Sequence, residues 1–381
     1  MPTFYEFFAG GGMARAGLGS HWECLFANDF DSKKGDSYAA NWGRDRLKVG
    51  DVGLLKTSEI PGIADLVWGS FPCQDLSLAG GYAGLKGARS GTFWPFWRLM
   101  RALSREHRIP RMIVLENVCG ALSSHGGKDF AAIGRALSDG GYRFGALVID
   151  AVRFVPQSRP RLFFVGVQRD QALPSALTRS YPVKVWHPPN LVGAYNKLSH
   201  QSKDAWIWWD LPCPTTRMSR FVDLVEDEPT GVAWHSDVES SRLLSMMTPL
   251  NFQKVEKAIR CGRRVVGGLY RRTRLNEKGV RVQRAEVRFD DIAGCLRTPS
   301  GGSSRQTLLA VDGESVRSRL LSPREAARLM GLPESYKLPE NYNDAYHLIG
   351  DGVAVPVVRF LASHLLEPQM EAQRNREHVA A

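Results

Sequence analysis

Four short apolar runs near the start of the chain each end in a glycine-rich or polar cluster, and this arrangement constrains the fold more than any other feature. The runs cover residues 3–8, 24–27, 64–68 and 111–115, and the clusters after them are Ala9-Gly10-Gly11-Gly12, Asn28-Asp29, Gly69-Ser70-Phe71-Pro72-Cys73-Gln74 and Glu116-Asn117-Val118. Helix-like segments alternate with the runs, which is the pattern of a doubly wound parallel sheet. Because ligands bind at the carboxyl ends of such strands, the clusters are predicted to meet in one crevice.

The later pattern indicates two domains, as the length of 381 residues also does. Residues 92–107 carry apolar side chains at helical spacing, and residues 145–151 and 161–167 form strand-like runs whose short link suits an antiparallel pair. Proline and tryptophan then interrupt the regular pattern. We therefore expect an α/β domain over 1–184, a smaller irregular domain over 185–312 and a return to the first domain over 313–381. The return begins with a capping box at Ser322-Pro323-Arg324-Glu325.

Positive charge is concentrated in one part of the chain, which has a formal net charge of +11. Residues 260–305 contain eleven arginines and one lysine against four acidic residues. A solvated basic surface is the simpler interpretation, but the abundance of arginine and the interleaved glycines favour contact with phosphates and bases. The sequence thus points to a polyanionic partner.

The cysteines and the apolar segments argue against several classes of protein. The six cysteines are scattered without a Cys-x-x-Cys pair, so neither a zinc site nor a disulfide framework is expected, and a reducing cytoplasm fits better. We interpret Cys24 and Cys119 as buried, unreactive thiols. No basic segment precedes an apolar stretch at the amino terminus, and no apolar run approaches the ~18 residues of a membrane helix. We therefore expect neither a signal peptide nor a membrane segment.

The first glycine cluster suggests a nucleoside-binding turn. Asp29 follows Gly10 by about 20 residues, the spacing at which an acid holds a ribose hydroxyl. Arg15 occupies the sixth position of the dinucleotide fingerprint, where glycine is required. An adenosine ligand without phosphates therefore fits better than a dinucleotide, and a nicotinamide oxidoreductase is disfavoured. A plain turn remains the alternative.

The third and fourth clusters contain groups suited to covalent catalysis. Cys73 directly follows a strand-like run and is placed as a nucleophile, although a buried inert thiol is the competing interpretation. The loop after it, residues 75–90, is rich in glycine and serine, as a closing lid would be. Glu116 supplies an acid or a helix cap, and Arg159 and Arg161 supply two fixed cations that can lower a thiol pKa or hold a carbonyl oxygen.

Together these motifs give the chain a clear resemblance. They occur in this order: Phe8-Ala9-Gly10-Gly11-Gly12, Phe71-Pro72-Cys73-Gln74, Glu116-Asn117-Val118, Gln157-x-Arg159-x-Arg161, Ser322-Pro323-Arg324-Glu325-Ala326 with Met330-Gly331-Leu332-Pro333, and Gly350-Asp351-Gly352-Val353. Over nearly its whole length the chain resembles the DNA (cytosine-5) methyltransferases of bacterial or phage type. The resemblance implies a Rossmann-like, S-adenosylmethionine-dependent methyltransferase domain with a smaller, irregular target-recognition domain.

The resemblance also implies a reaction and its catalytic residues. A cytosine would be flipped out of duplex DNA, Cys73 would attack its carbon 6, and the methyl group of S-adenosylmethionine would pass to carbon 5, leaving S-adenosylhomocysteine. Glu116 would hydrogen-bond ring nitrogen 3 and the amino group. Arg161 would hold the oxygen at position 2, Arg159 would support the thiolate and its loop, and Gln74 belongs to the same group.

Cofactor and DNA contacts follow from the resemblance in the same way, and no metal is expected. The expected cofactor residues are Phe8, Gly10, Gly12, Asp29, Phe30, Asp51, Asp351 and Val353. The expected DNA-binding residues are Ser77, Arg263, Arg264, Arg271, Arg272, Arg297, Gly301 and Gly302. The sequence departs from the usual pattern at Glu6, where aspartate is commoner, at Asp351, where asparagine is commoner, and at Cys295, where a threonine often precedes the leucine of the recognition loop.

The expected partners are double-stranded DNA and a cognate restriction endonuclease, with no membrane contact, for a monomer in the cytoplasm. Two alternatives stay open: a tRNA cytosine-5 methyltransferase and a catalytically inactive DNA-binding relative. Phe71 before Pro72 and the absence of a Cys-Phe-Thr element argue against the first. The presence of Cys73, Glu116 and Arg161 argues against the second. The sequence predicts neither the DNA target nor the base that removes the proton from carbon 5.

Overall fold

The structure is a computed structural model that describes residues 1–72, 90–214, 219–298 and 305–380. The chain forms two compact units. Unit 1 comprises residues 1–150, 160–214 and 353–381, and unit 2 comprises residues 151–159 and 215–352. Each unit is described by itself below.

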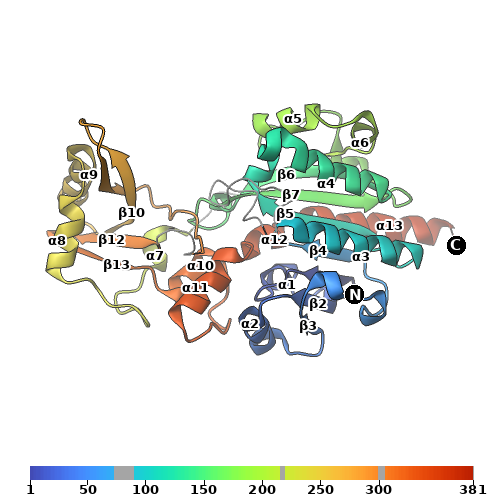
Figure 1. The fold of residues 1–381 in the computed structure, drawn as a ribbon, viewed down its shortest axis with the longest axis horizontal. Coiled ribbons are helices and arrows are strands. Elements are labelled where there is room, and N and C mark those ends of the chain that lie inside the picture. The colour runs from blue at the N-terminus through green and yellow to red at the C-terminus, as the bar shows by residue number, and fades with distance from the viewer. Residues whose placement is uncertain (73–89, 215–218, 299–304, 381) are drawn as a thin grey trace. The chain divides into compact units, whose positions relative to one another are not determined.

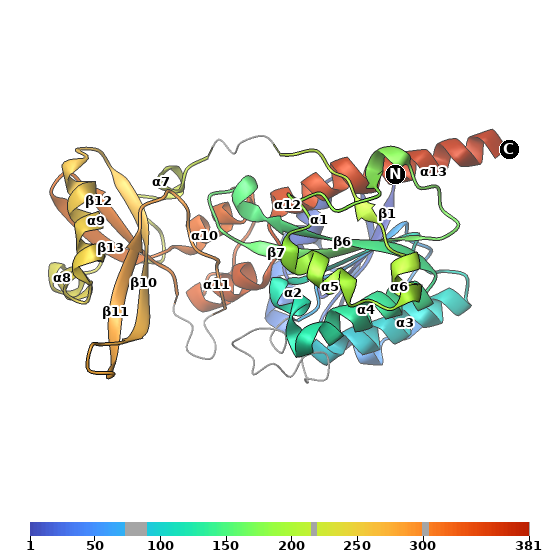
Figure 2. The ribbon, with the colours of Figure 1, turned by 90° about the horizontal axis from the view of Figure 1, so that it is seen from above.

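Unit 1 is built on a seven-stranded sheet in the order β3-β2-β1-β4-β5-β7-β6 (Figures 1 and 2). Its strands are β1 (Thr3–Phe7), β2 (Glu23–Asp29), β3 (Leu47–Val49), β4 (Leu66–Gly69), β5 (Met112–Val118), β6 (Tyr142–Asp150) and β7 (Pro160–Gln168). The first five are parallel, and β7 runs antiparallel to both β5 and β6. The predicted α/β fold and the predicted antiparallel pair are both confirmed.

Helices cover both faces of this sheet (Figure 2). They are α1 (Met13–Leu18), α2 (Ser32–Trp42), α3 (Phe93–Arg105), α4 (Lys128–Asp139), α5 (Pro189–Asn196), α6 (His200–Asp204), α12 (Val355–Leu361) and α13 (Glu367–Ala380), with a π-helical turn at Ala362–Leu366. Helix α3 confirms the prediction for residues 92–107. Its Phe93, Phe96, Met100 and Leu103 are all buried in the core, because they share one face of the helix.

Unit 1 extends further along the chain than the expected boundary at residue 184. The short strands β8 (Thr178–Arg179) and β9 (Trp208–Trp209) form a small sheet of their own. The Trp209 indole donates to the carbonyl of Val165 in β7 at 3.1 Å, and the backbone N–H of Ile207 donates to the carbonyl of Phe144 in β6 at 2.7 Å. Residues 185–214 thus complete the core of unit 1, because their aromatic side chains are buried against its sheet.

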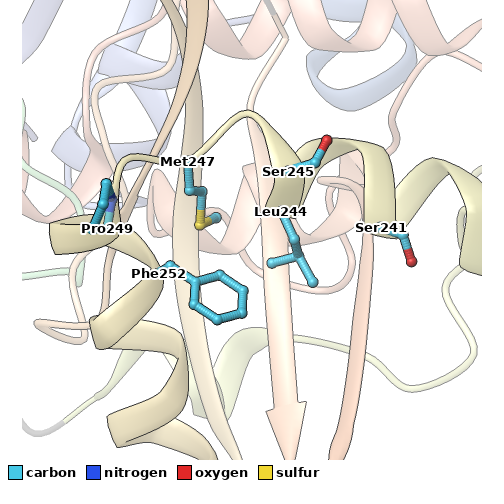
Figure 3. Close-up of a pocket in the computed structure, with 6 residues that line it drawn as sticks. All are labelled: Ser241, Leu244, Ser245, Met247, Pro249 and Phe252. Atoms are coloured by element: carbon cyan, nitrogen blue, oxygen red, sulfur yellow. The ribbon is translucent and has the colours of Figure 1, made fainter.

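Unit 2 contains a four-stranded antiparallel sheet in the order β11-β10-β12-β13. Its strands are β10 (Val265–Leu275), β11 (Arg281–Arg288), β12 (Thr307–Asp312) and β13 (Ser315–Leu320), and its helices are α7 (Phe221–Leu224), α8 (Asp237–Ser245), α9 (Pro249–Arg260), α10 (Pro323–Leu329) and α11 (Tyr342–Asp351). Leu269, Val287 and Leu309 of the sheet pack against Val255 of α9 in a separate core. A shallow, mainly apolar depression lies between α8 and α9 (Figure 3).

Residues 313–352 belong to unit 2, although the sequence suggested a return to the first domain at residue 313. The predicted capping box explains the difference. The Glu325 side chain accepts a hydrogen bond from the Ser322 backbone N–H at 2.8 Å, and it also binds Arg319 of β13 through two hydrogen bonds of 2.6 and 2.8 Å. Both ionic side chains have no exposed surface. Helix α10 is therefore fastened to the last strand of the unit 2 sheet.

The segment Tyr342–His378 is, among the described residues, the one helical stretch long and apolar enough to cross a membrane. The mean hydropathy of its most apolar window is 1.4, and 61% of that window is buried inside the protein. The prediction that no uninterrupted apolar run approaches 18 residues still holds, because charged residues such as Asp351 and Arg359 interrupt this stretch. Helices that line a protein core pass the same test, so the segment is weak evidence for a membrane helix.

Candidate active site

The carboxyl ends of β1, β2 and β3 lie side by side in unit 1. The backbone N–H of Gly10, after β1, donates to Oδ2 of Asp29 at 2.7 Å. The backbone N–H of Gly50, after β3, donates to the carbonyl oxygen of Asp29 at 2.8 Å, so Asp51 follows directly beside the end of β2. Two of the clusters predicted to meet, the glycine turn and Asp29, are therefore in contact, and Asp51, which the resemblance implied, follows beside them.

The glycine turn after β1 depends on left-handed backbone angles. Gly10 and Gly12 have φ values of 54° and 78°. Phe8 adopts a φ of 57°, a strained value for a bulky residue of the kind that functional sites retain. A side chain on Gly12 would place its Cβ 2.4 Å from Nε1 of Trp42, which itself donates to the carbonyl of Gly11 at 3.0 Å. Trp42 of α2 thus packs against the turn and stabilises it through this hydrogen bond.

The groups around this turn fit an adenosine-type ligand. Phe30 is an aromatic ring with 77% of its surface exposed, directly after the acid at the end of β2. Oδ1 of Asp29 accepts from the Asp31 N–H at 2.9 Å and Oδ1 of Asp51 accepts from the Gly53 N–H at 2.7 Å. Each carboxylate keeps further lone pairs for a hydroxyl or an amino group. No atom lies within 4 Å of a Cβ built on Gly10, so the turn borders open space.

Glu6, in β1 just before the glycine turn, carries a buried carboxyl group. Its side chain is 1% exposed, and burial raises its pKa to about 8. Oε1 accepts from the Arg15 N–H at 3.3 Å, whereas Oε2 has no hydrogen-bond partner among the described residues. The Arg15 guanidinium donates to the Tyr38 hydroxyl at 3.1 Å and lies 5.0 Å from the Trp42 ring centre. Sequence reasoning noted Arg15 only as a departure from the dinucleotide fingerprint and did not consider Trp42, because no motif links these two residues to each other or to Glu6.

Glu116 and Arg161 form an ion pair at the end of β5. Their Oε1 and Nε atoms are 3.2 Å apart, and the side chains are only 8% and 14% exposed. The pair forms because β7 runs antiparallel to β5 and places Arg161 opposite Val118. A fixed carboxylate and a fixed guanidinium side by side can bind a planar group that offers both a donor and an acceptor.

Asn117 links this pair to the segment that leads into the predicted nucleophile. Its side-chain amide donates to the carbonyl of Phe71 at 3.1 Å, and both residues are buried. Cys73 follows Phe71 by two residues, so the hydrogen bond ties the approach to the cysteine to the strand that carries Glu116. Cys73, Gln74 and Ser77 themselves lie outside the described residues. Sequence reasoning left Asn117 without a role, although it directly follows Glu116.

Arg159 is buried in unit 2 and binds main-chain carbonyl groups. Its guanidinium donates to the carbonyl oxygens of Leu296 at 2.9 Å, Gly350 at 2.8 Å and Gly352 at 2.6 Å. Gln157 supports the same segment, because its Oε1 accepts from the Leu296 N–H at 3.1 Å. These contacts indicate that the first arginine of the motif organises loops. Arg161, two residues later, belongs to unit 1.

The remaining predicted cofactor residues are divided between the units. Asp351 lies in unit 2, where it accepts a hydrogen bond from the Thr298 hydroxyl. Val353 is buried in unit 1, two residues before α12. Val353 therefore shares a unit with the glycine turn, whereas Asp351 does not.

The predicted DNA-binding arginines occupy different environments in unit 2. Arg271 and Arg272 are exposed neighbours on β10, and Arg297 is exposed after the buried Leu296. Arg264 forms an ion pair with Asp227 at 2.8 Å, and Arg263 donates to the Cys261 sulfur at 3.2 Å. Gly301 and Gly302 lie outside the described residues.

Cys24 is buried and Cys119 is partly buried, and neither resembles a reactive cysteine. Burial raises the pKa of Cys24 and of Cys119 to about 11 in each case, so both stay protonated near neutral pH. In the part of the chain that the structure describes, no cluster of three or more His, Cys, Asp or Glu residues could hold a metal ion.

Comparison with known proteins gives a match over almost the entire chain. The family model described as "C-5 cytosine-specific DNA methylase" matches residues 2–367. Type II methyltransferase M.HhaI of Haemophilus parahaemolyticus is 25% identical over 364 residues, which cover 95% of this chain and 93% of that protein. Type II methyltransferase M.HpaII of Haemophilus parainfluenzae is 26% identical over 387 residues, which cover 96% of this chain and 89% of that protein.

Solved structures share the fold at lower sequence identity. The Dnmt2 methyltransferase of S. pombe superposes with a TM-score of 0.56 at 17% identity, covering 97% of this chain and 99% of that one. An E. coli prophage protein described as a putative DNA modification methyltransferase gives a TM-score of 0.55 at 15% identity, covering 98% of this chain and all of that one. These likenesses concern the fold alone.

Proposed function

This chain belongs to the C-5 cytosine-specific DNA methylase family, and we propose that it methylates carbon 5 of a target cytosine in duplex DNA with Cys73 as the nucleophile. The family assignment makes it a DNA (cytosine-5) methyltransferase. The observation that carries the residue assignment is the buried ion pair of Glu116 and Arg161 at the end of β5, next to the segment that leads into Cys73.

Cytosine carbon 5 is a weak nucleophile, and the chemistry requires that its electron density be raised. The Cys73 thiolate adds to carbon 6, and the electron pair of the ring double bond moves toward carbon 5 and the ring carbonyl. Glu116 hydrogen-bonds ring nitrogen 3 and the amino group, which stabilises the charge that develops on the ring. Arg161 donates to the oxygen at position 2. The 3.2 Å ion pair keeps both groups fixed before the base arrives, so little reorganisation is needed.

We propose that the glycine turn, Asp29, Phe30 and Asp51 bind S-adenosylmethionine, which supplies an electrophilic methyl group when bound. The exposed Phe30 ring would stack on adenine, Asp29 would accept from the ribose hydroxyls and Asp51 from the adenine amino group. Phe8, Gly10 and Gly12 would border the methionine part, and Asp351 and Val353 would close the pocket. After transfer, removal of the carbon 5 proton and elimination of Cys73 restore the ring and free the enzyme.

The DNA contacts are assigned to the basic part of unit 2, with Ser77 and the segment around Gly301 and Gly302 as further contacts near the flipped base. Flipping costs a few kcal/mol, which phosphate contacts by arginine would offset. By analogy with the Type II relatives, a cognate restriction endonuclease is the proposed partner. We further propose that the enzyme works as a monomer in the cytoplasm.

Trapping of the covalent adduct tests the proposed nucleophile. The chain is incubated with S-adenosylmethionine and a duplex that carries 5-fluorocytosine at the target, after bisulfite sequencing of DNA from expressing cells has identified that target. Because fluorine cannot leave as a proton does, the wild-type chain should form a denaturation-resistant adduct. Cys73→Ser should form none yet keep its affinity for DNA. An adduct with Cys73→Ser would refute the assignment.

The two alternatives receive less support. The matching family model and the relatives named above are described by DNA methylation or Type II methyltransferase activity, which favours DNA over tRNA as the substrate. Methyl transfer to a tRNA pool but not to duplex DNA would reverse this choice. Glu116 and Arg161 form a paired, nearly buried site, which an inactive DNA-binding relative would have no need to keep.

A further inference from the structure

A two-stranded ribbon extends from the sheet of unit 2. Strand β10 pairs with β12 only from Val265 to Leu269, but its pairing with β11 continues to Leu275 opposite Arg281. Beyond Leu269, therefore, β10 and β11 form a two-stranded ribbon, and the further ladder contact seen among the described residues is a bridge between Ala285 and Met247 (Figure 2). A ribbon of this width can enter the major groove of B-form DNA.

Alternation along the strands divides the ribbon into two faces. Side chains point to opposite faces at successive positions, and the register pairs Arg272 with Arg284 and Tyr270 with Glu286. The Tyr270 face consists of Tyr270, Arg272, Arg274, Val282, Arg284 and Glu286. The Arg271 face consists of Arg271, Thr273, Leu275, Arg281, Gln283 and Ala285. The two adjacent arginines at 271 and 272 therefore cannot contact the same surface of a partner.

The Arg271 face continues the side of the sheet that is covered by helices. Ala285 is fully buried, and it packs in the same core cluster as Leu269 and Val255 of α9. The backbone N–H of Ala285 also donates to the carbonyl of Met246, just after α8, at 3.1 Å. A duplex approaching on this face would meet the two helices.

The Tyr270 face points to the other side, where the segment held by Arg159 lies. The Tyr270 hydroxyl is 3.3 Å from the side-chain amide of Gln306, and a Cβ on Gly294 would come within 2.3 Å of it. Two residues after Gly294 comes Leu296, whose carbonyl accepts a hydrogen bond from Arg159. The ribbon face and the segment leading to Arg297 thus share one side of unit 2.

The charges on the Tyr270 face are arranged for an anionic partner. Arg272 and Arg284 lie directly opposite each other, an arrangement of like charges that destabilises a free strand pair. The Glu286 carboxylate accepts a hydrogen bond from Nε of Arg274 at 2.6 Å and forms an ion pair with Nε of Arg272 at 3.3 Å, so it holds both guanidinium groups on this face. Among the described residues Arg284 has no ion pair. Three arginines and one acid leave this face with a charge of +2.

We propose that the Tyr270 face of the β10–β11 ribbon lies against the DNA duplex, with Arg272, Arg274 and Arg284 contacting it and Glu286 holding the first two in position. The assignment rests on the proposed function and narrows its basic region to one surface. It removes Arg271 from the predicted DNA contacts, and it adds Arg274 and Arg284, which sequence reasoning did not select.

Two single substitutions on the same strand test the proposal. Arg284→Ala removes a cation from the Tyr270 face, and Arg281→Ala removes one from the Arg271 face as a matched control of equal charge. Binding to a fluorescent duplex carrying the bisulfite-defined target is measured by anisotropy between 50 and 300 mM salt. Arg284→Ala should weaken affinity by about tenfold and lower the slope of log K against log salt by about 1. Arg281→Ala should change affinity by less than about twofold, because charges beyond ~8–10 Å are screened.

Equal losses for the two variants, or a larger loss for Arg281→Ala, would overturn the assignment of the face. Methyl transfer by the wild-type chain is measured in the same preparation. If the wild type binds DNA but transfers no methyl group, the proposed function fails while the comparison of the two faces still stands. If the wild type is active and the variants do not differ, only the inference about the ribbon fails.

Discussion

Replacement of Gly12 by alanine should destabilise unit 1 far more than the same change at Gly10. Both glycines have positive φ values, of 78° and 54°, which cost alanine about 1–2 kcal/mol. At Gly10 the new Cβ meets no atom within 4 Å. At Gly12 it would lie 2.4 Å from Nε1 of Trp42 and 2.9 Å from a ring carbon of Tyr38, so one of these rings must move. Overpacking of this kind costs a further ~1–3 kcal/mol.

The expected loss of unfolding free energy is therefore about 2–5 kcal/mol for Gly12→Ala and about 1–2 kcal/mol for Gly10→Ala. Urea denaturation followed by far-ultraviolet circular dichroism gives both values. Since Trp42 also donates to the Gly11 carbonyl, a shift of its ring should disturb the turn and weaken S-adenosylmethionine binding, measured by calorimetry.

A double-variant cycle isolates the clash from the backbone cost. In a Trp42→Leu background, the additional loss caused by Gly12→Ala should fall toward the value for Gly10→Ala, because the indole no longer occupies the space. Equal losses for the two glycine variants in the wild-type background would refute the reasoning. So would an undiminished loss in the Trp42→Leu background.

Two further predictions concern buried ionisable groups. Glu325→Ala should destabilise unit 2 by about 3–5 kcal/mol, because it leaves the fully buried Arg319 without its carboxylate partner. The double change Arg319→Met with Glu325→Leu should cost less, because it removes both charges. Denaturation midpoints measure both losses, and an equal or larger loss in the double variant would contradict the argument. Burial lowers the pKa of His187 from 6.5 to about 4, so the unfolded chain takes up the proton first as the pH falls. The free energy of unfolding should then decrease by about 1.4 kcal/mol per pH unit below pH 6.5, and by about 3 kcal/mol in total by pH 4. His187→Gln should abolish this part of the pH dependence, measured by denaturation at several pH values. An unchanged pH dependence in the variant would exclude His187 as its source.

Local patterns predicted much of unit 1. The apolar runs before each cluster became parallel strands, and the short link between residues 151 and 160 correctly indicated the antiparallel pair β6–β7. The capping box at Ser322 also formed as expected. These features succeed because each depends on residues a few positions apart, whose hydrogen bonds and burial are decided within one element.

The domain boundaries could not be obtained in this way. The Trp209 indole donates a hydrogen bond to the carbonyl of Val165, 44 residues earlier in the chain, and the irregular segment 185–214 thereby belongs to unit 1. Arg319 and Glu325 place α10 with the unit 2 sheet. Composition shifted near residue 185, but a compositional change does not say which core the aromatic side chains will complete.

What the sequence alone determined is the chemistry: a thiol, an acid, two arginines and a glycine turn in the order of one family, on a fold whose strand ends bring several of them together. Only the tertiary structure decided their separate tasks. Arg161 pairs with Glu116 through the register of β5 and β7, whereas Arg159 turns to the carbonyls of Leu296, Gly350 and Gly352. The physical reason is that an arginine carries the same charge everywhere, and its role depends on which oxygen atoms the folded chain places within its reach.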